Sequence, residues 1–147
     1  MTAPRRTMRE RGAAAVEMAL VLPVLLLVLG GIIDLGRMYL GEIIVTNAAR
    51  DAARMAGFQT YTASQVQTRG VQSASGVNPF VTTSTPTTST PTACALYGTE
   101  TTTTTSVTVT APGFSWLVLN VVPSLFGGTI AAPTIASTAT VQCTPTS

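Results

Sequence analysis

Glu17 is the residue of this chain whose position most needs a chemical explanation. It is the only charged residue in an apolar stretch that runs from Ala13 to Ile33. A carboxylate at the middle of a bilayer costs roughly 2.5–3.5 kcal/mol, and residues kept at such a cost usually have a function. Gly12 comes directly before the stretch and ends a leader that contains four arginines and one glutamate. The spacing of this glycine and glutamate suggests a processing signal.

The composition gives little support for catalytic activity of this chain. The chain has no His, which removes most metal sites and most acid–base catalysis. Asp34, Glu42 and Asp51 lie on one predicted helix and Glu100 stands alone, so we interpret them as solvated charges. Only two charged residues follow Arg54, which leaves no basic surface for nucleic acid. We expect no enzyme, no catalytic residue, no cofactor, no metal site and no small-molecule substrate.

The length of 147 residues allows one small domain beside the apolar stretch. As a helix, residues 13–33 would span about 32 Å, enough for a bilayer core. The basic leader, residues 1–12, has no counterpart after Ile33, so the positive-inside rule places the N-terminus in the cytoplasm and the remainder outside. The run is longer than a secretory signal core and no A-x-A-like site follows, which favours a retained helix. We expect a single-pass protein of the cytoplasmic (inner) membrane, with the lipid bilayer as a partner.

The helical pattern continues from Ile32 to about Ala56. One apolar or small stripe recurs every three to four residues: Ile33, Gly36, Leu40, Ile44, Ala48 and Ala52. Two acid–base pairs have i,i+3 spacing, Asp34 with Arg37 and Asp51 with Arg54. We predict that residues 34–57 form an amphipathic helix that continues the transmembrane helix as one spine of roughly 66 Å, ended by Gly57. A membrane anchor followed by a short separate helix is the alternative.

Beyond the spine the composition becomes polar. Residues 58–93 are predicted to be a Ser/Thr/Pro-rich linker or loop, and the low-complexity tract Thr82–Thr92 (TTSTPTTSTPT) is typical of flexible or O-glycosylated segments. Residues 94–147 should form a small β-rich domain. Its predicted strands are Cys94–Tyr97, Ser106–Thr110 and Ile135–Cys143. The fold class is therefore α+β, a long N-terminal membrane-spanning helical spine followed by a small Thr-rich antiparallel β domain with flexible loops.

The most apolar segment outside the spine is Phe114–Phe126, FSWLVLNVVPSLF. Thirteen residues that include Pro123 are too few to span a membrane. The segment either lies under the sheet as a core element or forms an exposed patch that docks onto membrane or partner. We favour the core, because a domain this small needs an apolar contributor and has few others.

Cys94 and Cys143 are expected to form a disulfide. Both fall outside the membrane in the predicted topology, where disulfides persist. Cys143 shares a strand face with Val141 and Cys94 shares one with Leu96, so pairing is feasible. The bond would close a loop of about 50 residues and contribute roughly 4 kcal/mol on the chain-entropy model. A redox-active pair is disfavoured because no C-x-x-C spacing is present.

The N-terminal third resembles a known family. The sequence RGAAAVEMALVLPVLLLVLGGIIDLGRMY, followed by TNAARDAARMAG, is similar to the TadE-like pseudopilins, minor pilins of the Tad (tight adherence) pilus machinery. The resemblance extends from Arg11 through Gly57 and is weaker in the tail, where SVTVTAP and IASTATVQC look like terminal strands of that family. The Thr-rich insert has no counterpart.

The resemblance implies a specific role for the glycine–glutamate signature. A prepilin peptidase would cut between Gly12 and Ala13, and Glu17 would serve recognition or assembly. Other pilins or pseudopilins and the pilus assembly platform are then further partners, in a function of surface attachment. One departure is Met18, which stands where the family usually has an aromatic residue.

Elementary electrostatics gives the same signature a mechanism. Cleavage would create an α-ammonium group on Ala13 at the tip of an apolar helix, and Glu17 of a neighbouring subunit could neutralise it. Both charges are costly alone at low dielectric and much less costly as a pair, so pairing would favour the assembled state. A signal-anchored surface protein that is never processed is the alternative function.

Overall fold

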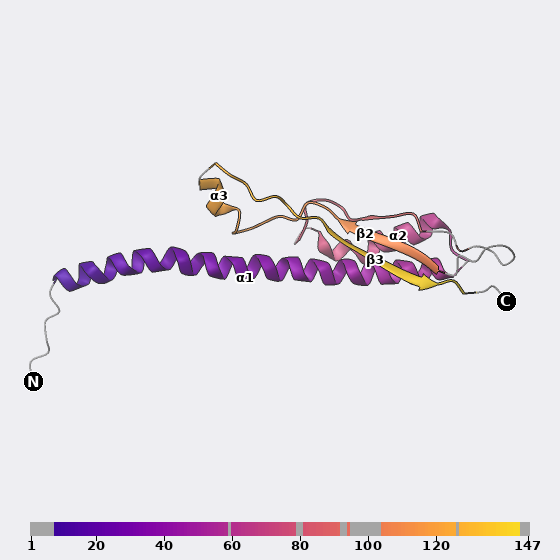
Figure 1. The fold of residues 1–147 in the computed structure, drawn as a ribbon, viewed down its shortest axis with the longest axis horizontal. Coiled ribbons are helices and arrows are strands. Elements are labelled where there is room, and N and C mark those ends of the chain that lie inside the picture. Colours follow the sequence, from indigo (N-terminus) through magenta and orange to yellow (C-terminus); the bar gives the residue numbers. More distant parts are fainter. Residues whose placement is uncertain are drawn as a thin grey trace, which may run out of the picture.

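One very long helix dominates the computed structural model, which describes residues 8–58, 60–78, 81–91, 94, 104–125 and 127–144. The elements in chain order are α1 (Met8–Gly57), α2 (Ala63–Ser73), the 3-10 turn η1 (Ser75–Val77), β1 (Thr87–Thr88), β2 (Thr104–Ala111), α3 (Val121–Leu125) and β3 (Ile135–Gln142). Figure 1 shows that the described elements after α1 lie alongside it and leave its N-terminal part projecting beyond them. The predicted α+β class is confirmed.

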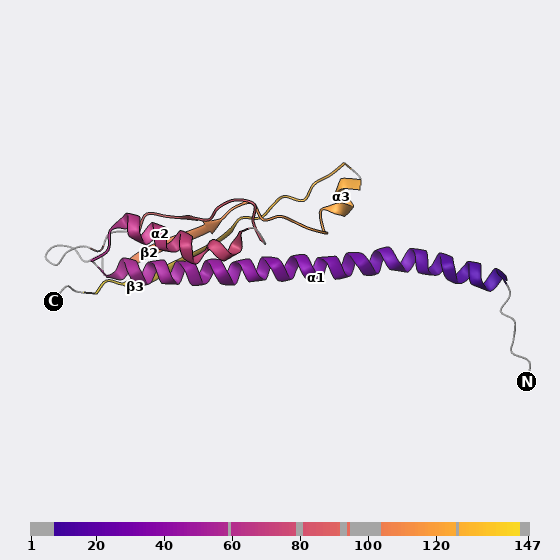
Figure 2. The same cartoon turned by 180° about the vertical axis from the view of Figure 1, so that it is seen from behind.

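Helix α1 is continuous over 50 residues and passes through Pro23 without a break. At 1.5 Å per residue it spans about 75 Å. The predicted single spine is therefore present, and the alternative of an anchor followed by a separate helix is wrong. The C-terminal domain, which we define as α2 through β3, packs along the second half of α1, as both views show (Figures 1 and 2).

The sheet has three antiparallel strands in the order β1-β2-β3. Strands β2 and β3 match two of the predicted strands to within two residues at each end, and Val107 of β2 pairs with Ala139 of β3. Alternate residues of β2, such as Val107 and Val109, are buried against α1 while the threonines between them are half-buried. This alternation is the period-2 pattern of a strand with one face on a core. Of the predicted strand Cys94–Tyr97, residues 95–97 lie outside the described residues.

The face of α1 that meets the domain consists of small residues. Its buried members are Gly30, Asp34, Gly41, Val45, Ala48, Ala49, Ala52, Ala53 and Gly57. The predicted stripe is correct at Ala48 and Ala52 and partly correct at Ile44, which packs half-buried on the core. It is wrong at Ile33, Gly36 and Leu40, which are exposed. The reason is the close approach of the domain: a Cβ added at Gly41 would lie 2.7 Å from the Val81 side chain. At the closest contacts only small residues allow this approach, whereas the larger Met38 and Ile44 pack half-buried at the edge of the core.

Two core clusters follow one another along α1. The first joins Val45, Ala48 and Ala49 to η1, to the strands and to Phe114. The second joins Ala52 and Ala53 to α2 and β2. Because most members are Ala or Val, the core contains few large side chains. A small domain with such a core buries little apolar surface.

Helix α2 corrects the prediction that residues 58–93 are only a linker or loop. Thr62 caps the helix: its hydroxyl accepts from the backbone N–H of Gln65 at 3.4 Å, and the Gln65 side chain accepts from the Thr62 N–H at 2.9 Å. This reciprocal capping box is a recognised helix start. Val66 and Gly70, four residues apart on one face, are buried against neighbouring elements.

The tract Thr82–Thr92 also differs from the predicted flexible loop. Thr82 is fully buried and forms an isolated bridge with Phe114. Thr87 and Thr88 form β1, and the next N–H, of Ser89, donates to the Thr108 carbonyl at 2.8 Å. Threonine is β-branched and suits a strand, which explains why a low-complexity tract can join the sheet.

Candidate processing and assembly site

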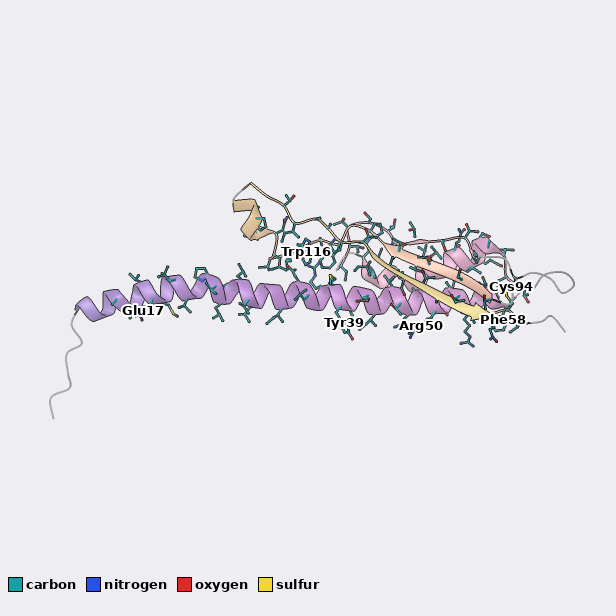
Figure 3. The ribbon with its side chains drawn as sticks, viewed as in Figure 1. Glu17, Tyr39, Arg50, Phe58, Cys94 and Trp116 are labelled. Atoms are coloured by element: carbon teal, nitrogen blue, oxygen red, sulfur yellow. A yellow bond between two sulfur atoms is a disulfide. The ribbon has the colours of Figure 1, made fainter. Side chains whose placement is uncertain are left out.

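The predicted processing residues lie at the free end of α1. Gly12, Ala13 and Glu17 are helical and exposed, and Figure 3 shows Glu17 far from the C-terminal domain. Within the described part of the chain, Glu17 makes no hydrogen bond or ion pair. No described residue therefore compensates this carboxylate. Headgroup water at the cytoplasmic face or a group on another subunit can compensate it.

The glycines of α1 fall into two kinds. At Gly30 an added Cβ would overlap the Val118 side chain, and at Gly41 it would crowd Val81, so the fold requires small residues there. At Gly12 an added Cβ would meet nothing within 4 Å. A glycine inside a helix costs roughly 0.5–1 kcal/mol relative to alanine. No packing contact in the described structure explains why a glycine stands at position 12 despite this loss of helix stability.

The segment between Gly12 and Asp34 exposes its large apolar side chains almost completely. Its most apolar 18-residue window has a mean hydropathy of 2.6, and only 6% of it is buried. Exposed examples are Val16, Leu20, Val21, Leu25, Leu26 and Ile32. Within the described residues this is the one helix long and apolar enough to cross a membrane. A core helix of a soluble protein would be mostly buried, so the segment is compatible with a single-pass membrane anchor.

Asp34 marks the end of this segment and is fully buried. The backbone N–H of Leu117 donates to its Oδ1 at 3.0 Å, and the N–H groups of Val118 and Leu119 each donate to Oδ2 at 2.9 Å. Arg37 donates to Oδ1 at 3.3 Å, as the i,i+3 spacing predicts. Burial alone would raise the pKa of Asp34, but the three N–H groups and Arg37 outweigh it and hold that pKa below its ordinary value.

Arg37 extends the same attachment. It also donates to the Ser115 carbonyl at 3.0 Å, and its guanidinium carbon lies 5.7 Å from the centre of the Phe114 ring. Asp34 and Arg37 thus fasten the start of the apolar segment Phe114–Phe126 to α1. The expectation that Asp34 belongs to a solvated face is wrong. Its partners are backbone groups more than 80 residues away, for which the sequence carries no signal.

Asp51 has a different partner from the one predicted. Instead of Arg54, Arg69 of α2 donates to its Oδ2 at 2.7 Å, and the Ser73 hydroxyl donates to the same oxygen at 2.7 Å. The Ser73 hydrogen bond, together with Arg69 and the more distant charge of Arg54, lowers the pKa of Asp51 although partial burial opposes this. The group fixes α2 against the second half of α1.

The two cysteines form a disulfide in the structure. Cys94 and Cys143 are bonded across 49 residues of sequence with their Cα atoms 5.8 Å apart. Figure 3 places Cys94 near Phe58, at the end of α1. The Gly57 carbonyl there accepts from both the N–H (3.1 Å) and the hydroxyl (2.9 Å) of Thr144. The last strand is therefore fastened at the point where the long helix ends.

These features describe a class of protein: a small, disulfide-linked α+β domain carried on a membrane-length helix. No group of three or more Cys, Asp or Glu in the described ranges is placed to hold a metal ion. The TadE-like protein family model matches residues 12–54, which confirms the predicted resemblance over α1 and leaves the C-terminal domain unmatched. No curated protein and no solved structure matches the chain. The match covers less than a third of the chain, and the long apolar helix is compatible with a pilus-related membrane protein.

Proposed function

We propose that this protein is a minor pilin or pseudopilin that takes part in assembly of a Tad-type, type IV-like pilus. A prepilin peptidase cuts it between Gly12 and Ala13, and Glu17 then pairs with the new α-ammonium group of a neighbouring subunit. The protein is held in the cytoplasmic membrane with its N-terminus inside and its C-terminal domain outside, and other pilins and the assembly platform are its partners.

The carrying observation is the isolation of the first half of α1. Its large apolar side chains and its single carboxylate are exposed together in the described structure, where burial begins only at Gly30, near the end of the segment. Lipid covers the apolar side chains in the membrane, and neighbouring helices can replace the lipid in a fibre. The Glu17 carboxylate then meets the α-ammonium group of a neighbouring subunit when the subunits pack. Membership of a pilus-type assembly accounts for both halves of this observation.

N-terminal sequencing of the membrane-extracted protein tests the processing step. We expect a chain that begins at Ala13, and a chain that still begins at Met1 or Thr2 would contradict the proposal. Gly12→Leu should remain uncut, since the fold leaves open space at Gly12. The matched control is Gly36→Leu on the same helix, where a Cβ also meets nothing within 4 Å. This control should be cut like the wild type.

The pairing step is tested by Glu17→Gln, which keeps the shape of the side chain and removes its charge. We expect normal membrane insertion and loss of pilus formation in cells that carry the whole system. Glu42→Gln, at another exposed position of α1, is the matched control and should assemble. Pili made normally by the Glu17 variant would exclude the charge pair as a requirement.

The alternative function is a signal-anchored surface protein that is never processed. The same helix would serve that role, and the disulfide-linked domain would simply be displayed outside. Under this alternative the chain keeps its leader and neither Gly12→Leu nor Glu17→Gln changes its surface level. The open space at Gly12 favours the pilin proposal, because an unprocessed anchor has no need of a glycine there.

A further inference from the structure

The connection between β2 and β3 forms a projecting apolar hairpin. We use this name for residues 116–131, whose described part carries α3 at its tip. In Figures 1 and 2 the hairpin extends beyond the sheet toward the N-terminal end of α1. Its base is fixed by the three N–H bonds to Asp34, and the Val118 side chain packs on Gly30. The hairpin is therefore held beside the membrane-length part of the helix.

The large exposed side chains of the hairpin are apolar, its exposed polar residues are the small Ser124 and Thr129, and none of its side chains is charged. Leu117, Val121 and Ile130 are exposed by 64%, 51% and 38%, and the chain has no ionisable side chain between Thr101 and Ser147. Large apolar side chains grouped in this way on a soluble surface mark a site of contact with a membrane or another protein. The predicted core role of Phe114–Phe126 is correct for Phe114 and wrong for Leu117 and Val121, which are exposed.

Much of the polar backbone of the hairpin is already paired internally. The Trp116 indole Nε1–H donates to the Ala131 carbonyl at 3.1 Å and closes the base. Higher up, the Ile130 N–H donates to the Asn120 side chain at 3.1 Å, and the Gly128 N–H donates to the Pro123 carbonyl at 2.8 Å. Unpaired backbone groups are what usually keep loops out of lipid. The pairing therefore lowers the free-energy cost of moving this loop into the bilayer interface.

The depth of the hairpin follows from its contact with α1. If residues 13–33 cross the hydrocarbon core, Gly30 lies about 5 Å inside its outer boundary at 1.5 Å per residue. Val118, which touches Gly30, is at the same level, and α3 lies beyond it on the side of the N-terminus (Figure 1). Interfacial segments typically insert their apolar face by about 5–10 Å. Trp116, with its apolar ring and polar N–H, then lies near the headgroups, where tryptophan is enriched.

We propose that the apolar hairpin is a second membrane contact, with its tip inserted in the outer-leaflet interface beside the span of α1. The proposal rests on the membrane anchor of the proposed function. Lipid is the occupant because the apolar surface of the hairpin continues that of residues 13–33, which lipid already covers. Together the helix and the hairpin hold the C-terminal domain at a fixed height above the bilayer until the subunit is extracted.

The single tryptophan of the chain makes the proposal measurable in the full protein. In a Trp116→Phe background, one new tryptophan is placed at the hairpin tip (Val121→Trp), in the span (Leu27→Trp) or at the far end of the domain (Tyr61→Trp). Each variant is reconstituted in phosphatidylcholine vesicles that carry bromine at shallow or deep acyl positions. We expect shallow bromines to quench the Val121 variant most, both kinds to quench the Leu27 variant, and neither to quench the Tyr61 variant.

The outcomes separate the hairpin from the anchor. A Val121 variant that stays unquenched while the Leu27 variant is quenched would overturn the hairpin contact and leave the anchor intact. An unquenched Leu27 variant would instead overturn the anchor. If the Val121 variant escapes lipid quenching and becomes shielded from aqueous acrylamide only at high protein density, a second copy covers the hairpin and the lipid proposal fails.

A second measurement uses the native tryptophan and does not depend on the folding of the moved probes. Val121→Asp places a charge at the tip and should move the emission of Trp116 to longer wavelength and reduce its quenching by shallow bromines. Thr87→Asp, at an exposed position of β1, is the control and should change neither. Unchanged emission in the Val121→Asp variant would also overturn the proposal.

Discussion

The two halves of α1 use opposite kinds of side chain for opposite surroundings. Residues 13–33 expose Leu, Val and Ile, whereas residues 34–57 bury Ala, Gly and Val against the C-terminal domain. The helix is the same continuous element throughout. The comparison shows that large apolar residues here mark the surface that faces outward, and small ones mark the surface where protein packs on protein.

The second half should depend on the domain for its stability, and the first should not. Removal of the disulfide should give the largest effect on the stability of the domain. Replacing both Cys94 and Cys143 by serine should lower the free energy of unfolding of the domain by about 4 kcal/mol, because the unfolded chain gains the freedom of a long open loop. Amide hydrogen exchange in detergent micelles should then lose protection in residues 45–56 and keep it in residues 16–30.

Reduction of the wild-type protein with dithiothreitol serves as the control for this substitution. It should reproduce the same pattern of exchange without any change of sequence. Equal loss of protection in both halves of α1 would contradict the comparison, since it would show that the whole helix unfolds with the domain.

Asp34 lies at the boundary between the halves and should give the next largest effect. Asp34→Ala leaves three backbone N–H groups without their acceptor and Arg37 without its carboxylate, which should cost about 3 kcal/mol in the attachment of the hairpin. Limited proteolysis should cut the chain near residues 116–131 faster in this variant. Glu42→Gln is the control, because Glu42 is exposed on the same helix. Proteolysis at the wild-type rate would mean that packing of Val118 on Gly30 is sufficient.

Two substitutions of opposite kind test whether small side chains are needed only where α1 packs against the C-terminal domain. Ala52→Leu forces a large side chain between α1 and the sheet and should cost about 1–3 kcal/mol, by urea unfolding followed through Trp116 emission. Leu26→Ala removes an exposed side chain and should change the stability of the domain by less than about 0.5 kcal/mol. Equal effects of the two changes would show that the halves do not differ in packing.

These tests also indicate how far the sequence could predict the structure. The length of α1 and the inner faces of β2 and β3 follow from periodicity, which the chain displays clearly in its apolar residues. The buried side of α1 is harder to predict, because Ile33 and Leu40 are apolar and yet exposed. A helix that faces lipid or other subunits carries apolar residues on more than one side, so periodicity alone does not identify the buried side.

Other features were missed for different physical reasons. The T-x-x-Q capping box at Thr62 and Gln65 is visible in the sequence and could have revealed α2. Strand β1 lies in a Ser/Thr/Pro tract whose composition is that of a loop. The role of Asp34 could not be read at all, because its partners are N–H groups that every residue except proline possesses.

The smallest expected effect concerns Asp51, whose charge fixes α2 to the second half of α1. Since the fold lowers the pKa of Asp51 below its ordinary 3.8, its contribution should be present at neutral pH and lost as the pH falls through that lowered value. The Asp51–Arg69 pair is partly exposed, so a double-mutant cycle with Asp51→Asn and Arg69→Gln should give at most about 0.5 kcal/mol at neutral pH. The coupling should approach zero once the pH lies well below that lowered pKa, where the carboxyl is protonated. Coupling that persists there would show that hydrogen bonds to the neutral acid hold α2, and that charge contributes little to the second half of the helix.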